Sequence, residues 1–194
     1  VLEAMSPREV PSVHEGASTP ISGNERARAL HVHGEDGLGN INPSSYPDPV
    51  AAPIPPPAFK AILKNAERFP GEAILVATGP LTNLAQAVRE KPDSFSLFRE
   101  IIIMGGAVRV PGNVTPHAEF NIWSDPEALE IILAFGVSPV LVPLDVTMQV
   151  VLTPDHFKCL SPQNSSVRFV LDCTREYMEF HKRTRGVSGC FLHD

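Results

Sequence analysis

A chain of 194 residues has the length of one globular domain and is short for two. Its residues are 43% hydrophobic and 20% charged, the composition of an ordinary soluble globular protein. The net charge is −6, and the Lys and Arg residues are scattered, which leaves no basic footprint for a nucleic-acid backbone. We therefore expect a small molecule as the partner and no nucleic acid.

The cysteines argue against a secreted protein held together by disulfides. Three cysteines without CxxC spacing suggest neither a disulfide framework nor a zinc knuckle, so reduced thiols in the cytoplasm are the simplest interpretation. No apolar run approaches the length of a membrane-spanning helix and no signal sequence opens the chain, so we expect no membrane contact. The chain begins at Val1, which hints at a missing beginning, although processing or tag removal gives the same start.

The first third of the chain shows little regular structure. Residues 8–17, REVPSVHEGA, hold a short strand candidate, and residues 31–40, HVHGEDGLGN, form a polar and glycine-rich segment. Seven of the twenty prolines fall between Pro43 and Pro57, too many for a helix or a central strand. We interpret this segment as a stiff surface loop.

From residue 59 onward, strands and helices alternate. Apolar residues at positions 59, 62, 63 and 66 predict one face of a helix that ends near Pro70. Residues 72–79, EAILVATG, predict a buried strand, and PLTNLAQAVRE starts the next helix with proline in its first turn. The further predicted elements are a strand over 99–106, a helix over 125–136, a strand over 138–147, and a late helix facing inward through Val167, Val170, Leu171, Thr174 and Met178.

This alternation predicts an α/β fold with a mostly parallel, open sheet and helices on both faces, of the Rossmann-like kind. In such sheets ligands bind outside the carboxyl ends of the strands. The loops at that edge are ATGPLTN, GGAVRVPGNVTPHAEFN and PLDVT. The second loop contains GNVTPHAEFN, residues 112–121, which holds two asparagines, a glutamate, a threonine and a histidine. We therefore place the candidate site there.

Six strings carry a resemblance to a known family. In chain order they are HVHGEDGLG, ATGPLTNLA, IIIMGGA, GNVTPHAEFNIWSDPEA, PLDVT and the closing LHD. Each is weak alone, but together they resemble the inosine-uridine preferring nucleoside hydrolase family over nearly the whole chain. The resemblance implies that family's fold, a ribonucleoside substrate, hydrolysis of its N-glycosidic bond to base and ribose, a bound calcium ion, and often a homo-oligomer.

The resemblance also assigns substrate-binding residues. Asn113, Glu119 and Asn121 match the family's sugar-binding positions, and His33 matches a position that lines the pocket. Ribose hydroxyls need fixed donors and acceptors, and burying such groups is tolerable only when the sugar satisfies them. A carboxylate such as Glu119 also stabilises the positive charge of an oxocarbenium-like transition state.

Calcium and the leaving base have their own matching residues. Calcium prefers hard oxygen ligands, including backbone carbonyls. By resemblance, Thr78 supplies a carbonyl ligand and Asp194 a carboxylate ligand. His193 aligns with a histidine that donates a proton to the departing base, a role that suits an imidazole near neutral pH.

One departure from the family pattern affects the expected activity. The N-terminal DxDxGxDD signature, which supplies most calcium ligands and the general base, does not occur in this sequence. Residues 1–17 resemble the segment that follows it, and family members continue beyond the position of Asp194. We therefore expect a single partial domain over 1–194, incomplete at both ends, inactive or nearly so, and unstable or oligomeric because a missing strand would expose backbone edges.

Less specific interpretations remain open beside these. Asn113 and Asn121 could satisfy their own loop backbone, Asp125 fits a helix cap, and Asp145 fits a buried structural residue at a strand end. His31 and His33 could suggest a zinc pair, but in a strand they would point to opposite faces.

Functions other than hydrolysis also have some support in the sequence. A dehydrogenase fits poorly, because the glycines do not form G-x-G-x-x-G at a helix start. The main alternatives are a non-catalytic binder of nucleosides or ribose and the product of a truncated gene.

Overall fold

A computed structural model describes residues 11–23, 28–45, 55–158, 160–161 and 163–194. They belong to two compact units. Unit 1 takes its described residues from Val1–Ser12, Arg28–Ile54 and Gln149–Leu192. Unit 2 takes its described residues from Val13–Ala27, Pro55–Met148 and His193–Asp194. A single domain over 1–194 stays a prediction.

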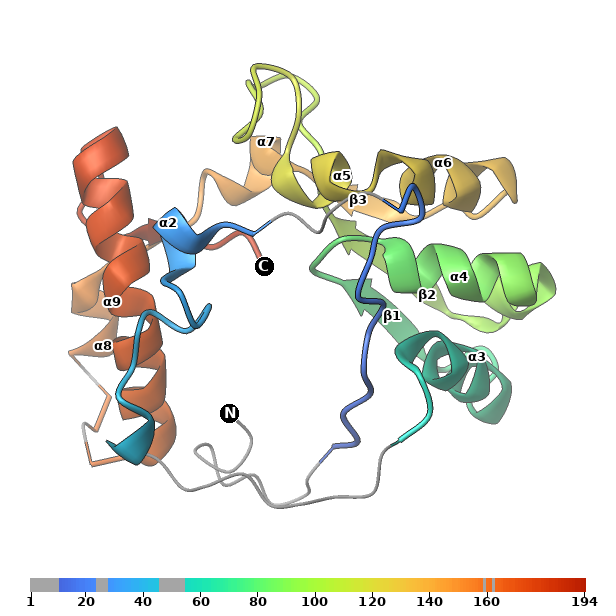
Figure 1. Cartoon of the computed structure of the whole chain (residues 1–194), viewed down its shortest axis with the longest axis horizontal. Coiled ribbons are helices and arrows are strands. Elements are labelled where there is room, and N and C mark those ends of the chain that lie inside the picture. The colour runs from blue at the N-terminus through green and yellow to red at the C-terminus, as the bar shows by residue number, and fades with distance from the viewer. Residues whose placement is uncertain (1–10, 24–27, 46–54, 159, 162) are drawn as a thin grey trace. The chain divides into compact units, whose positions relative to one another are not determined.

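Unit 2 is built on a parallel sheet of three strands in the order β1-β2-β3 (Figure 1). The strands are β1 (Ile74–Ala77), β2 (Glu100–Met104) and β3 (Val140–Val142). The connection from β1 to β2 contains α4 (Thr82–Glu90) and the 3-10 helix η2 (Pro92–Leu97), and that from β2 to β3 contains α5 (Phe120–Ser124) and α6 (Pro126–Ala134). The predicted α/β class with a parallel sheet is confirmed.

Three helices cover one face of this sheet. The helix α3 (Ala58–Arg68), together with α4 and α6, packs its apolar face against side chains of β2. The predicted helical spacing holds in α3, where Leu63 and Ala66 are buried and Phe59 and Ile62 pack at the margin of the core. The fully buried centre of this core consists of Ala85, Ala87, Val88, Ile103, Ala128 and Ile132.

The opposite face of the sheet is open to solvent. Ile74 is 42% exposed, Val76 57% and Val140 49%, and register pairs Val76 with Ile102 and Ile102 with Val140 on that face. The prediction of a buried strand over 72–79 is therefore wrong. Successive side chains of a strand point to opposite faces, and the described helices cover one face of the sheet, so only every second side chain of β1 reaches them.

The last predicted strand is shorter than its sequence pattern indicated. The prediction spanned 138–147, but β3 ends at Val142, and Leu144–Thr147 forms the short helix α7 after Pro143. Proline has no amide hydrogen to donate to a neighbouring strand, and its fixed φ suits the residue before a helix. The change from strand to helix at Pro143 brings Thr147 into the candidate site described below.

Unit 1 is dominated by one long helix. It contains α2 (Leu30–His33), the 3-10 helix η1 (Pro43–Ser45), β4 (Val151–Leu152), α8 (Pro154–Phe157), α9 (Ser165–Arg185) and β5 (Cys190–Phe191). β4 pairs with β5 in antiparallel fashion. The side chain of Asn164 caps the start of α9, and Gly186 ends it in the left-handed conformation, with φ of 66°. The late helix is confirmed, but its predicted inward face is corrected: the buried residues are Phe169 and His181. The residues predicted to face inward are only half-buried, namely Val167, Val170, Leu171, Thr174 and Met178.

Two expectations for the first third of the chain are modified. Residues 11–17 form no strand, and residues 8–10 of that strand candidate lie outside the described part. The polar segment 31–40 begins as the last three residues of α2. Of the proline-rich segment, Pro43–Ser45 forms a 3-10 turn, and residues 46–54 lie outside the description.

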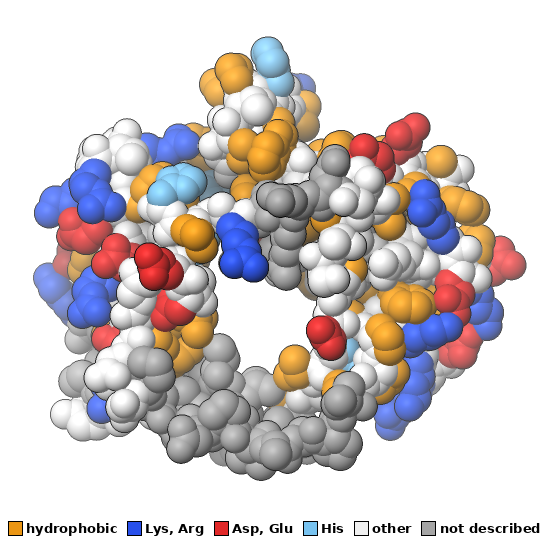
Figure 2. All heavy atoms as spheres, viewed as in Figure 1, with side chains coloured by type: hydrophobic (Ala, Val, Ile, Leu, Met, Phe, Trp, Pro, Cys, Tyr) orange, Lys and Arg blue, Asp and Glu red, His pale blue; other side chains and the backbone are white. Residues whose placement is uncertain are grey.

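The surface charge agrees with the mixed composition of the sequence. Figure 2 shows basic and acidic side chains interspersed on the face in view, with no large area of one sign. Among the described residues, no helix is long and apolar enough to cross a membrane.

Candidate functional site

The side chain of Asn121 joins three segments at the carboxyl edge of the sheet in unit 2. Its Nδ2 lies 3.1 Å from Asp194 Oδ1, 3.3 Å from the carbonyl oxygen of Met104 and 3.5 Å from that of Thr78. Thr78 follows β1 and Met104 ends β2, so parallel pairing brings both carbonyls to one edge. Asn121 is 4% exposed, which makes these hydrogen bonds important, since a buried amide without partners is costly.

Glu119 is the second buried polar residue of this cluster and is 2% exposed. Its carboxylate occupies the N-cap position of α5 and accepts hydrogen bonds from the backbone N–H groups of Asn121 at 2.9 Å and Ile122 at 3.2 Å. It also accepts from Gly106 N at 3.0 Å, in the loop after β2. A carboxylate offers about four acceptor positions, so capacity for one further donor remains.

Asn113 lies in the exposed part of the same loop. Its Oδ1 accepts a hydrogen bond from Phe120 N at 2.9 Å, which holds the loop against the start of α5. The Nδ2 of Asn113 makes no hydrogen bond with the described part of the chain. The loop closes tightly at Gly112, where a Cβ would lie 2.2 Å from the carbonyl oxygen of Ala118. Asn113 therefore braces the loop with one atom of its amide group and leaves the other available to a ligand.

Asp145 holds the first half of this loop. Its Oδ2 accepts from Val108 N at 2.9 Å and its Oδ1 from Arg109 N at 2.7 Å. The hydrogen bond from the Val108 N–H is the main cause that holds the pKa of Asp145 below its usual range. Asp145 belongs to the first turn of α7 and is only half-buried, which corrects its predicted place as a buried residue at a strand end.

His193 is oriented by a residue that sequence reasoning missed. Its Nδ1 lies 2.7 Å from the hydroxyl oxygen of Thr147, which is 4% exposed at the end of α7. Thr147 is the last residue of the PLDVT string, so a signal for it was present in the sequence. The next residue, Asp194, has its pKa raised by burial of the carboxylate, an effect that the hydrogen bond from Asn121 opposes.

His33 belongs to unit 1 and packs on α9. Its ring lies 5.1 Å from that of Tyr177, and the ring of His31 lies 5.8 Å from that of Phe180. Burial lowers the pKa of His33, and His181 and His31 lower it further. The premise that His31 and His33 sit in a strand is wrong, because both occupy a helical turn and contact α9. No group of three metal-binding side chains occurs among the described residues.

Asp125 occupies the N-cap position of α6 but does not cap the helix with its side chain, so the prediction of a cap is corrected. Its side chain makes no capping hydrogen bond. Instead, Oδ2 accepts from the Thr82 hydroxyl and from Ile21 N at 2.9 Å. Because Asp125 is fully buried, it ties the segment around Ile21 and the start of α4 to the start of α6.

The hydrogen bonds therefore connect most of the predicted site residues in unit 2. Thr78, Asn121 and Asp194 share one amide group, Glu119 accepts from the backbone of Asn121, and Asn113 reaches the neighbouring Phe120. His193 is adjacent to Asp194 in sequence and is held by Thr147. His33 lies in unit 1.

The chain has clear relatives among known proteins. The family model described as inosine-uridine preferring nucleoside hydrolase matches residues 1–194. The chain is 37% identical over 187 residues to "Probable uridine nucleosidase 1" of Oryza sativa subsp. japonica, a match that covers 96% of the chain and 56% of the relative. It is 39% identical over 186 residues to "Non-specific ribonucleoside hydrolase RihC" of Escherichia coli, covering 96% of the chain and 58% of the relative.

A solved structure gives the same result. The structure titled "Plant nucleoside hydrolase - PpNRh1 enzyme" matches with a TM-score of 0.87 and 36% identity, covering 99% of this chain and 60% of that chain. The chain therefore spans little more than half the length of the relatives it matches. Since the family model extends over every residue, the chain belongs to the inosine-uridine preferring nucleoside hydrolase family.

Proposed function

We propose that this chain carries the sugar-binding and leaving-group side of a site that hydrolyses the N-glycosidic bond of ribonucleosides. The main observation behind this proposal is the side-chain amide of Asn121. Its nitrogen lies within hydrogen-bond distance of oxygen atoms of Thr78, Met104 and Asp194 at the carboxyl edge of a parallel sheet. This is the edge where α/β proteins bind small ligands. The names of the relatives, a probable uridine nucleosidase and a non-specific ribonucleoside hydrolase, support the choice of reaction.

In this proposal, Asn113, Glu119 and Asn121 recognise ribose. Glu119 accepts from three backbone amides, so its carboxylate is held in one orientation before a sugar arrives. One further acceptor position suits a sugar hydroxyl, and Nδ2 of Asn113 supplies a donor nearby in the chain. The buried negative charge of Glu119 then stabilises positive charge that develops on the ribosyl group as the bond to the base breaks.

His193 donates the proton that lets the base leave. We propose Nε2 as the proton donor, because Nδ1 lies 2.7 Å from the Thr147 hydroxyl oxygen. A threonine that donates to Nδ1 favours the tautomer with a hydrogen on Nε2, and an imidazolium carries that hydrogen as well. Thr147 is thus a positioning residue, because it sets the ring orientation without reaching the substrate. The assignment of His33 to the pocket stays a prediction.

The residues present suit calcium in kind but are few. The Thr78 carbonyl and the Asp194 carboxylate are hard oxygens that share hydrogen bonds from the same Asn121 nitrogen, so they lie close together. Calcium takes roughly six to eight oxygen ligands. We assign Thr78 and Asp194 as two of these ligands, and a bound calcium ion would supply Lewis-acid activation of water. Asn121 holds both oxygens in place and would give up part of that contact to the ion.

We expect no turnover by the chain of 194 residues alone. Its sequence has no DxDxGxDD signature, and no group of three metal-binding side chains occurs among the described residues. Without a carboxylate base, water attack at the anomeric carbon is not assisted. The test is release of reducing sugar from inosine and uridine, with excess calcium and with a chelator, using protein shown to be folded by circular dichroism. Turnover that the chelator abolishes would contradict this expectation.

The buried polar residues of the site also favour a second candidate function, which is binding of ribose or nucleosides without catalysis. The sugar-recognising residues Glu119 and Asn121 are present and buried in hydrogen bonds, whereas the acidic signature is absent from the sequence. Calorimetric titration with inosine and with ribose tests the sugar binding that this candidate requires. Saturable binding without turnover, weakened in Asn113→Ala and unchanged in Val108→Ala, would support the binder. Cytoplasmic location and homo-oligomer formation stay predictions.

A further inference from the structure

Gly106, which lies in the loop that follows β2, joins two parts of the candidate site through its backbone. Its N–H donates to Glu119 Oε2 at 3.0 Å, and its carbonyl oxygen accepts from Leu144 N at 2.9 Å, at the start of α7. The same helix α7 carries Thr147, which holds His193. One residue therefore connects the carboxylate proposed to recognise ribose with the helix that orients the proposed proton donor.

The backbone of Gly106 is left-handed, with φ of 86°. This conformation determines how its N–H and its C=O point relative to each other, and both groups are hydrogen-bonded. A residue with a side chain adopts a positive φ only at a cost, which is smallest for asparagine and aspartate. A Cβ at Gly106 would meet no atom within 4 Å. The backbone conformation rather than a lack of space therefore requires glycine here.

The two oxygens of the Glu119 carboxylate have different partners. Oε2 accepts from the N–H groups of Gly106 and Ile122, whereas Oε1 accepts from Asn121 N alone among the described residues. Gly105 packs against the first of these oxygens, because a Cβ built on it would lie 3.3 Å from Oε2. Each carboxylate oxygen accepts about two hydrogen bonds, so the acceptor position that remains lies on Oε1.

We propose that Gly106 is a positioning residue for sugar recognition: its left-handed backbone holds Glu119 with Oε2 against the protein and leaves Oε1 to a ribose hydroxyl. The inference rests on the proposed function, since it assumes that Glu119 binds the sugar. Without the N–H of Gly106, the carboxylate retains hydrogen bonds from the first turn of α5 alone. An acceptor position on Oε2 then becomes free and competes with Oε1 for the hydroxyl.

The test compares ribose affinity in variants of the full chain of 194 residues by calorimetric titration. Gly106→Ala, which strains the left-handed backbone, should weaken ribose binding by about tenfold. Gly106→Asn should weaken it less, although asparagine is larger than alanine, because asparagine tolerates the left-handed conformation better. A purely steric role of Gly106 would give the opposite order of affinities and would overturn the proposal.

Gly136→Ala is the matched control for a general loss of stability. Gly136 is also left-handed, with φ of 76°, and a Cβ there also meets no atom within 4 Å. It belongs to unit 2 but precedes β3, whereas the candidate site follows the ends of the strands. Gly136→Ala should lose about as much stability in urea as Gly106→Ala and bind ribose like the parent chain. Equal losses of ribose affinity would assign the effect to instability and overturn the proposal.

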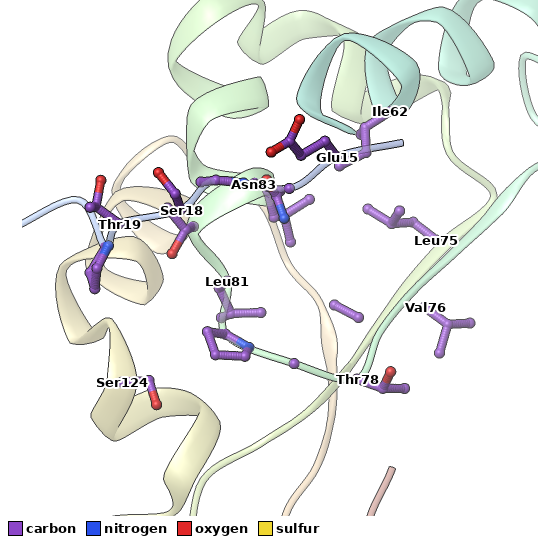
Figure 3. Close-up of a pocket in the computed structure, with 18 residues that line it drawn as sticks. Glu15, Ser18, Thr19, Ile62, Leu75, Val76, Thr78, Leu81, Asn83 and Ser124 are labelled. Carbon is purple, nitrogen blue, oxygen red and sulfur yellow. Dashed lines mark hydrogen bonds between the residues drawn. The ribbon is translucent and has the colours of Figure 1, made fainter. Parts of the chain in front are cut away.

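A pocket of unit 2 contains a second set of hydroxyl groups that a sugar would meet. Figure 3 shows Ser18, Thr19 and Thr78 among the residues that line it, and neither Gly106 nor Glu119 is one of them. Ser18→Ala removes one hydroxyl from this pocket and should leave ribose affinity unchanged. A loss of affinity in Ser18→Ala as large as that in Gly106→Ala would place the sugar in the pocket and overturn the proposal.

A measurement without sugar separates this inference from the proposed function. Hydrogen exchange followed by NMR should show that Glu119→Gln lowers the protection of the Gly106 amide more than that of Ala85, which is bonded within α4. Glu130→Gln, at an exposed position of α6, should leave the protection at Gly106 unchanged.

The two measurements together show which claim fails. A parent chain that binds neither ribose nor inosine would refute sugar recognition and this inference with it. A parent chain that binds ribose, with protection at Gly106 unchanged in Glu119→Gln, would overturn the inference alone. Weaker ribose binding in Gly106→Ala, together with reduced protection at Gly106 in Glu119→Gln, is the expected result.

Discussion

The side-chain amide of Asn121 donates a hydrogen bond to Asp194 Oδ1 at 3.1 Å, across 73 positions of the sequence. Asn121 is buried in α5, while Asp194 is the last residue of the sequence. The same nitrogen also faces the carbonyls of Met104 and Thr78. One donor group thus determines how three acceptors approach each other, and the candidate site depends on its chemistry.

Asn121→Asp should destabilise unit 2 strongly. The substitution replaces a donor with a carboxylate that faces two carbonyl oxygens and the carboxylate of Asp194, so attraction becomes repulsion in a buried place. We expect the free energy of unfolding in urea to fall by about 3 kcal/mol. Asn113→Asp is the control, because Asn113 is exposed and its Oδ1 still accepts from Phe120 N. Equal effects of the two substitutions would contradict this account.

Asp145→Asn should loosen the loop between β2 and α5. The carboxylate accepts from both Val108 N and Arg109 N, whereas an amide keeps one acceptor oxygen and no charge. Hydrogen exchange of these two backbone amides, followed by NMR, should accelerate by about tenfold. Asp93→Asn, on the exposed start of η2, should leave both rates unchanged. Retained protection in Asp145→Asn would show that other contacts hold the loop.

Gly112→Ala should prevent the loop from closing. A Cβ at this position would lie 2.2 Å from the carbonyl oxygen of Ala118 and 2.4 Å from its nitrogen, and neither backbone atom can rotate away as a side chain can. We expect a loss of about 2 kcal/mol or more in the free energy of unfolding. Gly79→Ala is the matched control, since a Cβ there meets no atom within 4 Å. A small effect at Gly112 would mean that the loop relaxes at little cost.

His181 should make unit 1 less stable in acid. Burial is the main cause that lowers the pKa of His181 below its ordinary value of 6.5, with the Tyr177 carbonyl opposing and Arg185 adding to the shift. The folded state therefore prefers the neutral ring. Its contribution to stability is present above pH 6.5 and is lost as the pH falls through the lowered folded-state pKa, because the unfolded chain takes up the proton first.

The measurement is urea unfolding at about pH 7 and about pH 5, on either side of the ordinary histidine pKa. His181→Phe keeps an aromatic ring against Phe180 and Phe191 and should show a smaller drop in unfolding free energy than the parent chain. Part of the drop should remain, because His33 also has a lowered pKa. His117→Asn, at an exposed position of the other unit, should leave the drop unchanged. An equal drop in His181→Phe and the parent would remove His181 as its source.

Local sequence patterns determined most of the secondary structure. The spacing of Phe59, Ile62, Leu63 and Ala66 specified α3, and Pro126 and Gly136 bracketed α6, because these signals depend on the period of the helix and on the backbone freedom of single residues. The parallel arrangement followed from the alternation of strands and helices. The grouping of Asn113, Glu119 and Asn121 after β2 was visible for the same reason, since the loop is continuous in sequence.

Tertiary structure decided which groups these residues meet. The pattern EAILVATG does not say whether one face or both faces of β1 are covered, and in the described structure Ile74 and Val76 lie exposed on the face opposite α3, α4 and α6. Asp125 looked like a cap, but its partners Ile21 and Thr82 come from distant segments. The hydrogen bonds of Asn121 to Asp194 and of Thr147 to His193 span 73 and 46 positions. Such pairings depend on how strands and loops meet in space, which local periodicity does not encode.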